Sequence, residues 1–426
     1  MPLTASMKQS EVGLISTDWE LVPIQDLLEK NTRITYGVVQ PGREDPDGVL
    51  FVRGGDVFDG AIAENTLRTI SKSVAAQYKR TTLLGGELLI SLVGYPGECA
   101  LVPTSLIGAN IARQVAAVRF RRLNEFTPAF VCHLLRSTIG KRLLLKDAFG
   151  SAQQVINLRD VNKLCLPLPK LPEEQRAIAT ALSDVDALIA GLERLIAKKR
   201  DIKQATMQQL LTGKTRLPGF SGAWTQGVLG DVVKSLDAGV SVNSTDAVPE
   251  DGVPGVLKTS ALVGGTFIPS EVKVIEARDI PRARTSPKAD TVLVSRMNTP
   301  MLVGEVAYVH RDFDSIFLPD RIWMARFNSS KHVSVRWVAL LLSSRIYRDL
   351  LRDVATGTSG SMKNISKAAL LSLPILFPNP EEQTAIATVL SDMDTDIEAL
   401  EARLAKTRAI KQGMMQELLT GRTRLI

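Results

Sequence analysis

Cysteine and histidine are scarce in this chain of 426 residues, which contains three of each. Cys99, Cys132 and Cys165 form no C-x-x-C pair. Such an odd, spread set excludes a disulfide scaffold and is typical of reduced thiols in a cytosolic protein. Cys132 and His133 are adjacent, but no second group of ligands lies at a metal-binding spacing. We therefore expect core residues at this position and no metal site.

Long apolar runs are missing as well. The longest uncharged, largely apolar stretch, from Cys99 to Ala112, contains Pro103 and is shorter than the roughly 20 residues that a helix needs to cross a bilayer. Lys8 and Glu11 lie close to the N-terminus, where no apolar signal-peptide core occurs. The sequence therefore predicts a soluble, cytoplasmic protein.

Sequence motifs of catalysis are also missing. Gly213-Lys214-Thr215 resembles the end of a phosphate-binding loop, but Gln208 stands where that loop needs glycine. No glycine-rich fingerprint for a dinucleotide or S-adenosylmethionine occurs. Asn298-Thr299-Pro300-Met301 lacks the second proline and the aromatic residue of the amino-methyltransferase motif. The sequence thus indicates a binding subunit that is not an enzyme and holds no cofactor of its own.

A long internal repeat is the dominant feature that is present. Residues 172–217 and 380–425 align without a gap at an offset of 208, and 30 of the 46 aligned positions are identical. The rest of each half is only weakly similar, although both halves hold an apolar run that ends in serine, Leu88–Ser91 and Val292–Ser295. We expect a mixed α/β fold with globular domains at 1–170 and 218–378, and conserved helices at 171–217 and 379–426.

The repeated segment has the pattern of a long helix. Pro172 suits a first turn, Glu173 and Glu174 complement the helix dipole, and Gly213 and Gly421 provide C-terminal caps. Apolar residues alternate in steps of four and three, as the seam of a coiled coil requires. The predicted seam consists of Ile178, Leu182, Val185, Ile189, Leu192, Ile196 and Leu210, and of Ile386, Leu390, Met393, Ile397, Leu400, Leu404 and Leu418. We expect an antiparallel coiled coil with a pseudo-two-fold axis. The alternative is that each helix packs on its own domain.

The net positive charge lies outside the two repeated segments. The formal net charge is +7, and residues 1–170 and 218–378 carry +4 and +3, whereas the two repeated segments cancel. Basic side chains in loops are suited to contact DNA phosphates, and Arg and Asn also read base edges. The candidates for DNA contact are Lys79, Arg80, Arg113, Arg119, Arg121, Arg122, Arg282, Arg284, Lys288, Arg296, Asn298 and Arg321. For each of these alone, a solvated surface residue is the simpler interpretation, but the clusters together favour nucleic acid.

At this point the chain resembles the specificity subunit of type I restriction–modification enzymes. The residues that carry the resemblance are Pro172-Glu173-Glu174-Gln175, Leu210-Leu211-Thr212-Gly213, the second copies of both, and Leu217-Pro218-Gly219-Phe220 leading to Trp224. The resemblance covers the whole chain. It implies two target recognition domains, each reading one half of a bipartite double-stranded DNA target. It also implies that the helices set the spacing between them.

The resemblance further implies a set of partners. Two methyltransferase subunits dock on the helices and bring S-adenosylmethionine for DNA methylation, and restriction subunits use ATP and Mg in phage defence. None of this chemistry is expected in the present chain. Two other interpretations stay open, a DNA-binding subunit of another multi-subunit defence complex and a coiled-coil scaffold that binds no DNA.

Overall fold

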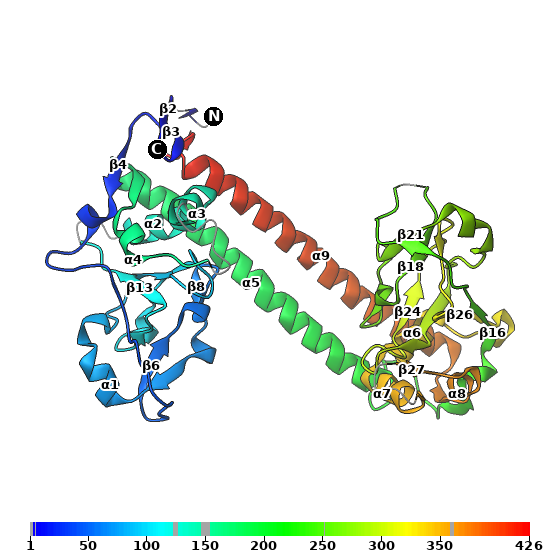
Figure 1. Cartoon of the computed structure of the whole chain (residues 1–426). Helices are drawn as coiled ribbons and strands as arrows, with labels where there is room; N and C mark the ends of the chain where they lie inside the picture. The colour runs from blue at the N-terminus through cyan, green and yellow to red at the C-terminus, as the bar shows by residue number, and fades with distance from the viewer. Residues whose placement is uncertain (1–2, 5, 122–126, 146–153, 251, 358–361) are drawn as a thin grey trace. The chain divides into compact units, whose positions relative to one another are not determined.

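The computed structural model describes residues 3–4, 6–121, 127–145, 154–250, 252–357 and 362–426. The chain forms two compact units (Figure 1). Unit 1 comprises Met1–Glu193 and Ala402–Ile426, and unit 2 comprises Arg194–Glu401. Each unit therefore holds one globular domain and parts of two long helices, α5 (Pro172–Leu210) and α9 (Pro380–Leu418). The division into two domains and two helices stays a prediction. The boundaries between the compact units lie inside α5 and α9.

The domain of unit 1 is built on an antiparallel four-stranded sheet. Its order is β11 (Cys99–Leu101), β10 (Leu88–Ser91), β13 (Val115–Val118) and β5 (Thr35–Tyr36). A second sheet has the order β12 (Asn110–Ile111), β6 (Val49–Val52) and β9 (Arg68–Ile70), with β12 and β6 parallel. The helices are α1 (Lys72–Gln77), α2 (Thr127–Arg136), α3 (Thr138–Leu145) and α4 (Leu158–Asn162).

The domain of unit 2 repeats this topology. Its main sheet has the order β24 (Val306–Val309), β22 (Thr291–Ser295), β26 (Ile322–Phe327) and β16 (Val233–Ala238). A second sheet has the order β25 (Ile316–Phe317), β18 (Gly255–Leu257), β21 (Val272–Ile275) and β17 (Ser244–Thr245), with β25 and β18 parallel. The helices are α6 (Val335–Ser343), α7 (Arg345–Asp353) and α8 (Lys367–Leu371).

The two weakly similar apolar runs thus form the same strand in both domains. Leu88–Ser91 is β10 and Thr291–Ser295 is β22, and each is fully buried in the middle of its sheet, as continuous apolar runs require. An antiparallel pair then leads into each long helix. In unit 1 it is β4 (Trp19–Pro23) with β14 (Cys165–Pro169), and in unit 2 it is β15 (Thr225–Val228) with β28 (Pro374–Phe377). The weak sequence similarity of the domains therefore reflects a common fold.

Short strands complete the structure. They are β1 (Leu3–Thr4), β2 (Met7–Ser10), β3 (Gly13–Ser16), β7 (Val57–Phe58), β8 (Ala61–Ile62), β19 (Leu262–Val263), β20 (Thr266–Phe267), β23 (Met297–Asn298), β27 (Lys363–Asn364) and β29 (Thr423–Arg424). β1 pairs with β29, so the two ends of the chain lie side by side in unit 1 (Figure 1).

The long helices begin and end as the sequence predicts. Pro172 and Pro380 are their first residues, and acidic side chains fill both first turns. Gly213 and Gly421 each have a φ of 69°, the left-handed conformation that glycine adopts without strain beyond a helix end. At about 1.5 Å per residue, each helix is about 60 Å long.

The first turns of the helices belong to the domain cores. Ile178 and Leu182 of α5 are fully buried with Trp19 and Phe130 in unit 1. Ile386 and Leu390 of α9 are fully buried with Trp337 in unit 2. The end of the other helix joins each core, through Leu418 in unit 1 and Leu210 in unit 2. Packing on the domain and pairing of the helices therefore coexist.

The two helices run antiparallel in both units. In unit 1, Asp186 and Glu193 of α5 pair with Lys411 and Arg408 of α9. In unit 2, Lys199 and Lys203 of α5 pair with Asp396 and Asp394 of α9. Positions therefore rise along one helix as they fall along the other, as the predicted antiparallel coiled coil requires.

Burial along the predicted seam varies. Buried seam side chains are Ile178, Leu182, Ile189, Leu192, Ile196, Leu210, Ile386, Leu390, Ile397 and Leu418. Half-buried ones are Val185, Met393, Leu400 and Leu404. Apolar side chains outside the seam, such as Leu188 and Ile202, are more than 40% exposed. The apolar stripe is thus narrow, as in a two-helix coil.

Candidate functional site

The repeated motifs meet in a buried ion pair in unit 2. Arg216, just beyond the end of α5, donates hydrogen bonds to both carboxylate oxygens of Glu382, at 2.5 Å and 2.6 Å. Glu382 lies in the first turn of α9 and its side chain is 0% exposed. The indole Nε1 of Trp224 donates to the same carboxylate at 3.3 Å. We call this contact between a helix start and the segment beyond the other helix a latch.

An equivalent latch closes in unit 1. Arg424 donates to Glu174 Oε2 at 2.7 Å and also to Asp18 at 2.9 Å. Glu174 is 1% exposed in the first turn of α5, and Arg424 follows the end of α9. The glutamate of each copy thus binds the arginine of the other copy. The identity of the repeated motifs therefore follows from a shared structural role.

The glutamine of each Pro-Glu-Glu-Gln motif fastens the helix start to its domain. Gln175 Nε2 donates to the carbonyl of Pro169 at 3.0 Å, and its Oε1 accepts from Thr127 at the start of α2, at 2.9 Å. Gln383 Nε2 donates to the carbonyl of Pro378 at 2.9 Å. Its Oε1 accepts from the backbone N–H of Ser334, the residue before α6.

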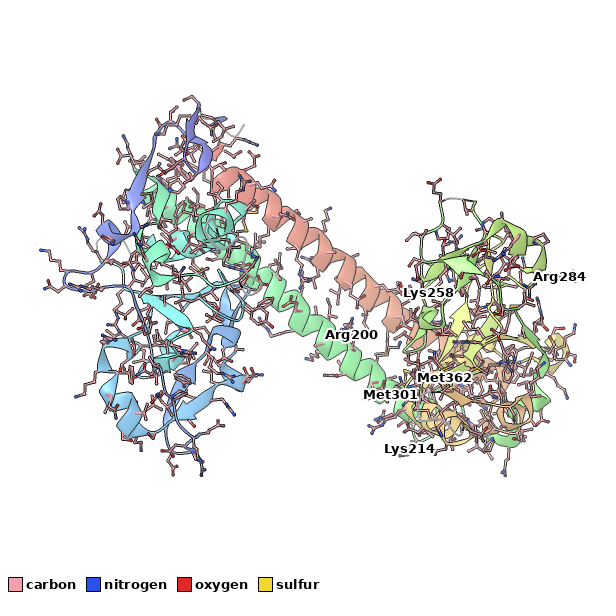
Figure 2. All side chains as sticks on the ribbon, viewed as in Figure 1. Arg200, Lys214, Lys258, Arg284, Met301 and Met362 are labelled. Carbon is pink, nitrogen blue, oxygen red and sulfur yellow. The ribbon has the colours of Figure 1, made fainter. Side chains whose placement is uncertain are left out.

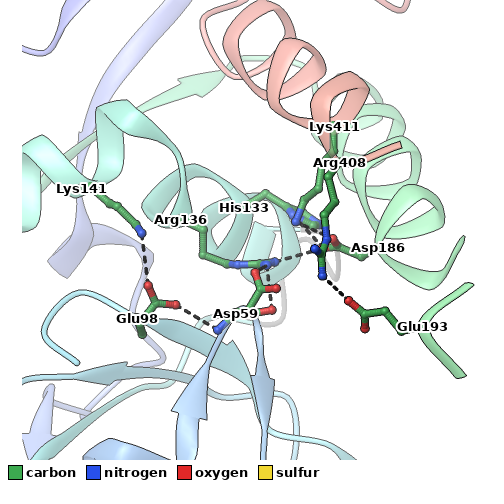
Figure 3. A network of polar contacts seen from close by, with 9 residues as sticks. All are labelled: Asp59, Glu98, His133, Arg136, Lys141, Asp186, Glu193, Arg408 and Lys411. Carbon is green, nitrogen blue, oxygen red and sulfur yellow. Dashed lines mark hydrogen bonds and ion pairs between the residues drawn. The ribbon is translucent and has the colours of Figure 1, made fainter. Parts of the chain in front are cut away.

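A second polar network joins the middle of the helices in unit 1 to the domain (Figure 3). Asp186 of α5 accepts from Arg136 of α2 at 3.0 Å and pairs with Lys411 of α9 at 2.5 Å. Burial acts to raise the pKa of Asp186, but the hydrogen bond from Lys411 and the charge of Arg136 hold it below the ordinary value. In unit 2, Asp394 contacts Lys203 of α5, the counterpart of Lys411. It also contacts Arg336, which stands at the start of α6, whereas Arg136 stands at the end of α2.

His133 lies within the unit 1 network. Its Nε2 is 3.1 Å from Ser183 Oγ and its Nδ1 is 3.9 Å from Asp186 Oδ2. Burial lowers the pKa of this imidazole to about 4, and the nearby cations Arg136 and Lys411 also lower it, against the attraction of Asp186. His133 is therefore neutral at pH 7 and serves the helix contact. In the part of the chain that the structure describes, no three His, Cys, Asp or Glu residues are placed to hold a metal ion.

Several predicted DNA contacts are held within the domains. Arg119 is paired with buried Glu87 at 3.3 Å, and Arg282 is paired with Asp279 at 3.1 Å. Lys288 contacts two carboxylates, Asp312 at 3.2 Å and Asp314 at 2.6 Å. These cations are already neutralised by their neighbours, so each is less available to a phosphate.

Two further candidates pack against the unit 2 sheet. Arg296 lies over the Trp323 ring at 5.3 Å and donates to the carbonyl of Asp320 at 2.8 Å. Asn298 is 6% exposed and accepts from the backbone N–H of Thr299 at 2.9 Å. Their local roles are structural. Arg122 lies outside the described residues.

The exposed candidates with no carboxylate partner among the described residues are Lys79, Arg80, Arg113, Arg121, Arg284 and Arg321. In unit 1, Asn110 holds two segments together, because it donates to the carbonyl of Tyr78 and accepts from Thr81. Lys79 and Arg80 therefore lie on a turn beside the loop that carries Arg113.

Unit 2 has a similar arrangement. The backbone N–H of Leu318 donates to the carbonyl of Thr285 at 2.8 Å, which brings the segment of Arg284 to the loop of Arg321. Figure 2 shows Arg284 at the surface of this domain. Arg113 and Arg321 occupy the same place in the two topologies, in the loop that precedes the central strand β13 or β26.

The functional pairs that the sequence did not single out are Arg216 with Glu382, Arg424 with Glu174, Asp186 with Lys411 and Asp394 with Lys203. The repeat itself was a signal that could have pointed to them. Each acidic residue of these pairs has an identical residue 208 positions away in the other copy, and so does each basic residue.

Comparisons with known proteins agree with the two-fold repeat. The family model described as "Type I restriction modification DNA specificity domain" matches residues 16–204 and 283–407. The type I restriction enzyme EcoBI specificity subunit of Escherichia coli is 28% identical over 204 residues, which cover 47% of this chain and 43% of that protein. The MjaVIII specificity subunit of Methanocaldococcus jannaschii is 26% identical over 220 residues, covering 51% of each protein. The chain thus spans about half the length of these relatives or less.

Solved structures show the same fold. The S subunit of a type I restriction-modification system from M. genitalium aligns with a TM-score of 0.60 and 15% sequence identity, covering 98% of this chain and 99% of that one. A structure of a type I R-M system aligns with a TM-score of 0.54 and 18% identity, covering 95% and 98%. Since the family model matches more than half of the chain, once in each half, the chain belongs to the type I restriction modification DNA specificity family.

Proposed function

We propose that this chain is the DNA-recognition subunit of a type I restriction–modification system, and that each domain reads one half of a bipartite duplex target. One observation carries the proposal. The family model matches residues 16–204 and again 283–407, on two domains of the same topology. A chain with two related recognition domains presents two similar DNA-binding surfaces, and these can differ in the bases that they select.

The exposed cations support the location of the DNA contacts. Arg113 and Arg321 sit in equivalent loops of the two domains, and Lys79, Arg80 and Arg284 lie on segments that neighbour them. Exposed arginine and lysine side chains provide phosphate contacts that position a protein, and arginine also reads guanine in the major groove. In this proposal the residues already paired with carboxylates, such as Arg119 and Lys288, stabilise the loops.

The proposal assigns the chemistry to other chains. Two methyltransferase subunits bind this chain and hold S-adenosylmethionine, and restriction subunits hold ATP and Mg, while this chain contributes recognition and spacing without catalysis. The crossed latches support a spacing role, because they fix the start of each helix to the end of the other. Among the described residues, no helix is long and apolar enough to span a membrane.

A methylation map tests the proposal. DNA from cells that contain the methyltransferase is sequenced for modified adenines, with and without this chain. We expect a bipartite, interrupted motif that is modified only when the chain is present. In a second assay the purified complex should prefer that motif over random DNA by about 1,000-fold or more at about 150 mM salt. Equal affinity for both duplexes contradicts recognition of sequence.

A non-DNA scaffold is the second interpretation. It predicts an unchanged methylation map when Arg113 and Arg321 are both replaced by glutamate. The recognition function predicts that this double variant loses modification while the complex still assembles.

A further inference from the structure

Asp279 is a buried carboxylate on the segment that carries predicted DNA contacts of unit 2. It lies in a short 3-10 helix, Ala277–Arg282, that follows β21, and it is 5% exposed. Its Oδ2 accepts from both the backbone N–H and the side-chain amide of Asn243, at 2.7 Å and 2.8 Å. Its Oδ1 accepts from Arg282 at 3.1 Å. Asp279 therefore links the loop before β17 to an arginine of its own helix.

The carboxylate of Asp279 is held in place independently of Arg282. The N–H groups of Asn243 occupy one oxygen, and the backbone N–H of Asp279 donates to the carbonyl of Glu276 at 2.8 Å. The hydrogen bond from the Asn243 backbone keeps the pKa of Asp279 below its ordinary value although burial acts to raise it, so the group is ionised at pH 7. A fixed anion of this kind orients a cation through a charge-assisted hydrogen bond.

Arg282 differs from an arginine whose side chain is bonded within its domain. Arg119 donates to Glu87 and to the carbonyl of Thr82, and its side chain is 22% exposed. Among the described residues, the side chain of Arg282 has one hydrogen-bond acceptor, Asp279, and it is 57% exposed. A guanidinium carries several N–H donors in one plane, so most donors of Arg282 stay available while the group is attached to a fixed point.

Arg282 stands beside other exposed cations of unit 2. The backbone N–H of Leu318 donates to the carbonyl of Thr285, which joins this segment to the loop of Arg321. The hydroxyl of Thr285 donates to the carbonyl of Ala238 at 3.0 Å, at the end of β16. The loop after β16, the segment of Arg282 and the loop before β26 therefore meet at one place on this domain.

We propose that Arg282 reads a guanine in the half-site of unit 2 and that Asp279 is the residue that positions it. The proposal rests on the proposed function and names a residue that selects a base. The ion pair as a whole is neutral, so it has little attraction for a phosphate. The O6 and N7 acceptors of guanine match the planar donors of an arginine. An arginine that is already oriented also loses less conformational freedom on binding.

Unit 1 is built differently at the corresponding place, after strand β9 of its second sheet. There the basic turn of Lys79 and Arg80 is held through its backbone, because Asn110 donates to the carbonyl of Tyr78 at 3.3 Å. Among the described residues, neither cation has a carboxylate partner. Both therefore keep their charge for phosphates, and we expect the reading of guanine from this place in unit 2 alone.

Binding assays with the full chain and its methyltransferase partner test the reading residue. The duplexes carry the methylated motif, or that motif with one base pair of either half-site replaced. Arg282→Ala removes the guanidinium. Asp279→Asn keeps an oxygen for Asn243 but presents an NH2 group to Arg282, which breaks the ion pair. Arg278→Ala is the matched control, since Arg278 is exposed on the same 3-10 helix and pairs with Glu276 at 2.9 Å.

We expect Arg282→Ala to lose about tenfold or more of its discrimination at one G·C pair of one half-site, with the other half-site unchanged. Asp279→Asn should lose discrimination at the same pair. Adding Arg282→Ala to it should cause no further loss, because the aspartate acts through the arginine. Arg278→Ala should keep the wild-type preference at every position.

A loss of affinity by Arg282→Ala that is equal for every duplex would assign this arginine to a phosphate and overturn the proposal. Wild-type discrimination by Arg282→Ala, or an altered position that is not a G·C pair, would also overturn it. Wild-type discrimination by Asp279→Asn would overturn the positioning role of the aspartate. A wild-type complex that binds all duplexes equally would instead contradict the proposed function.

Discussion

Arg216 and Glu382 lie 166 residues apart in the sequence, yet the guanidinium of one donates to both carboxylate oxygens of the other. The contact joins the segment beyond α5 to the first turn of α9. In unit 1 the corresponding residues Arg424 and Glu174 form the same contact. The motif that repeats most clearly in the sequence therefore has a structural role, which is to attach the start of each helix to the end of the other.

The first prediction concerns this latch. Glu382→Ala removes the acceptor for Arg216 and for the indole of Trp224 at a site that is 0% exposed. We expect the free energy of unfolding to fall by about 2 kcal/mol, because two donors lose their partner. Urea denaturation measures it. Glu381→Ala is the control, since Glu381 is exposed in the same turn and should change stability by less than about 0.5 kcal/mol. Equal effects of both substitutions would contradict the latch.

The second prediction concerns pH. His133 has a pKa of about 4 in the folded chain against 6.5 for the free side chain, so the unfolded state binds more protons between these values. Its neutral form therefore stabilises the fold above pH 6.5, and this stability is lost as the pH falls from 6.5 to 4. His133→Leu should show a smaller loss of Tm than the wild type over that window. Leucine is chosen as the replacement because Leu340 of α6 stands at the position of unit 2 that corresponds to His133. Parallel Tm curves for the two proteins would rule this effect out.

The third prediction concerns spacing. Seven residues are inserted after Glu193 in α5 and seven after Glu401 in α9, which are corresponding positions at the boundary of the compact units. One heptad preserves the apolar seam and every ion pair within each unit, and it lengthens each helix by about 10 Å. We expect the spacer of the methylated motif to grow by about three base pairs, at 3.4 Å for each. The two half-sites themselves should not change. A motif with its original spacer would show that the helices do not set the distance.

The fourth prediction concerns DNA contacts. Arg113→Ala and Arg321→Ala each remove an exposed cation from equivalent loops, so each should weaken binding to the cognate duplex by about tenfold. If these arginines read bases, each variant should also relax specificity in only one half-site. Lys288→Ala is the comparison, because that lysine is bound to Asp312 and Asp314. Its removal should change affinity by less than about threefold. A larger effect at Lys288 than at Arg321 would reverse the assignment.

Much of the architecture could be predicted because it depends on local pattern. Gly213 marks the end of α5 through its left-handed φ, and the apolar spacing of Ile178 and Leu182 identifies the buried face. The continuous run Leu88–Ser91 indicates a central strand, and β10 is one. These features involve residues that are near each other in sequence.

The candidate site could be predicted only in outline. Arg119 and Arg113 look equivalent in the sequence, but Arg119 pairs with Glu87 and Arg113 remains exposed, because the sheet brings β13 beside β10. The partner of Glu382 could not be identified from its neighbours, since the pairing depends on how two distant helix ends meet. Tertiary contacts decide which cations remain unpaired and exposed. Local sequence patterns do not reveal these contacts.

The crossed latches also bear on how such a chain can change over generations. A substitution at Glu174 must be accommodated by Arg424 in the other copy, and one at Glu382 by Arg216. A change at either glutamate therefore alters a contact with the other copy of the repeated segment. Each latch lies within one unit, so the remaining surface of either domain can change while both latches stay the same.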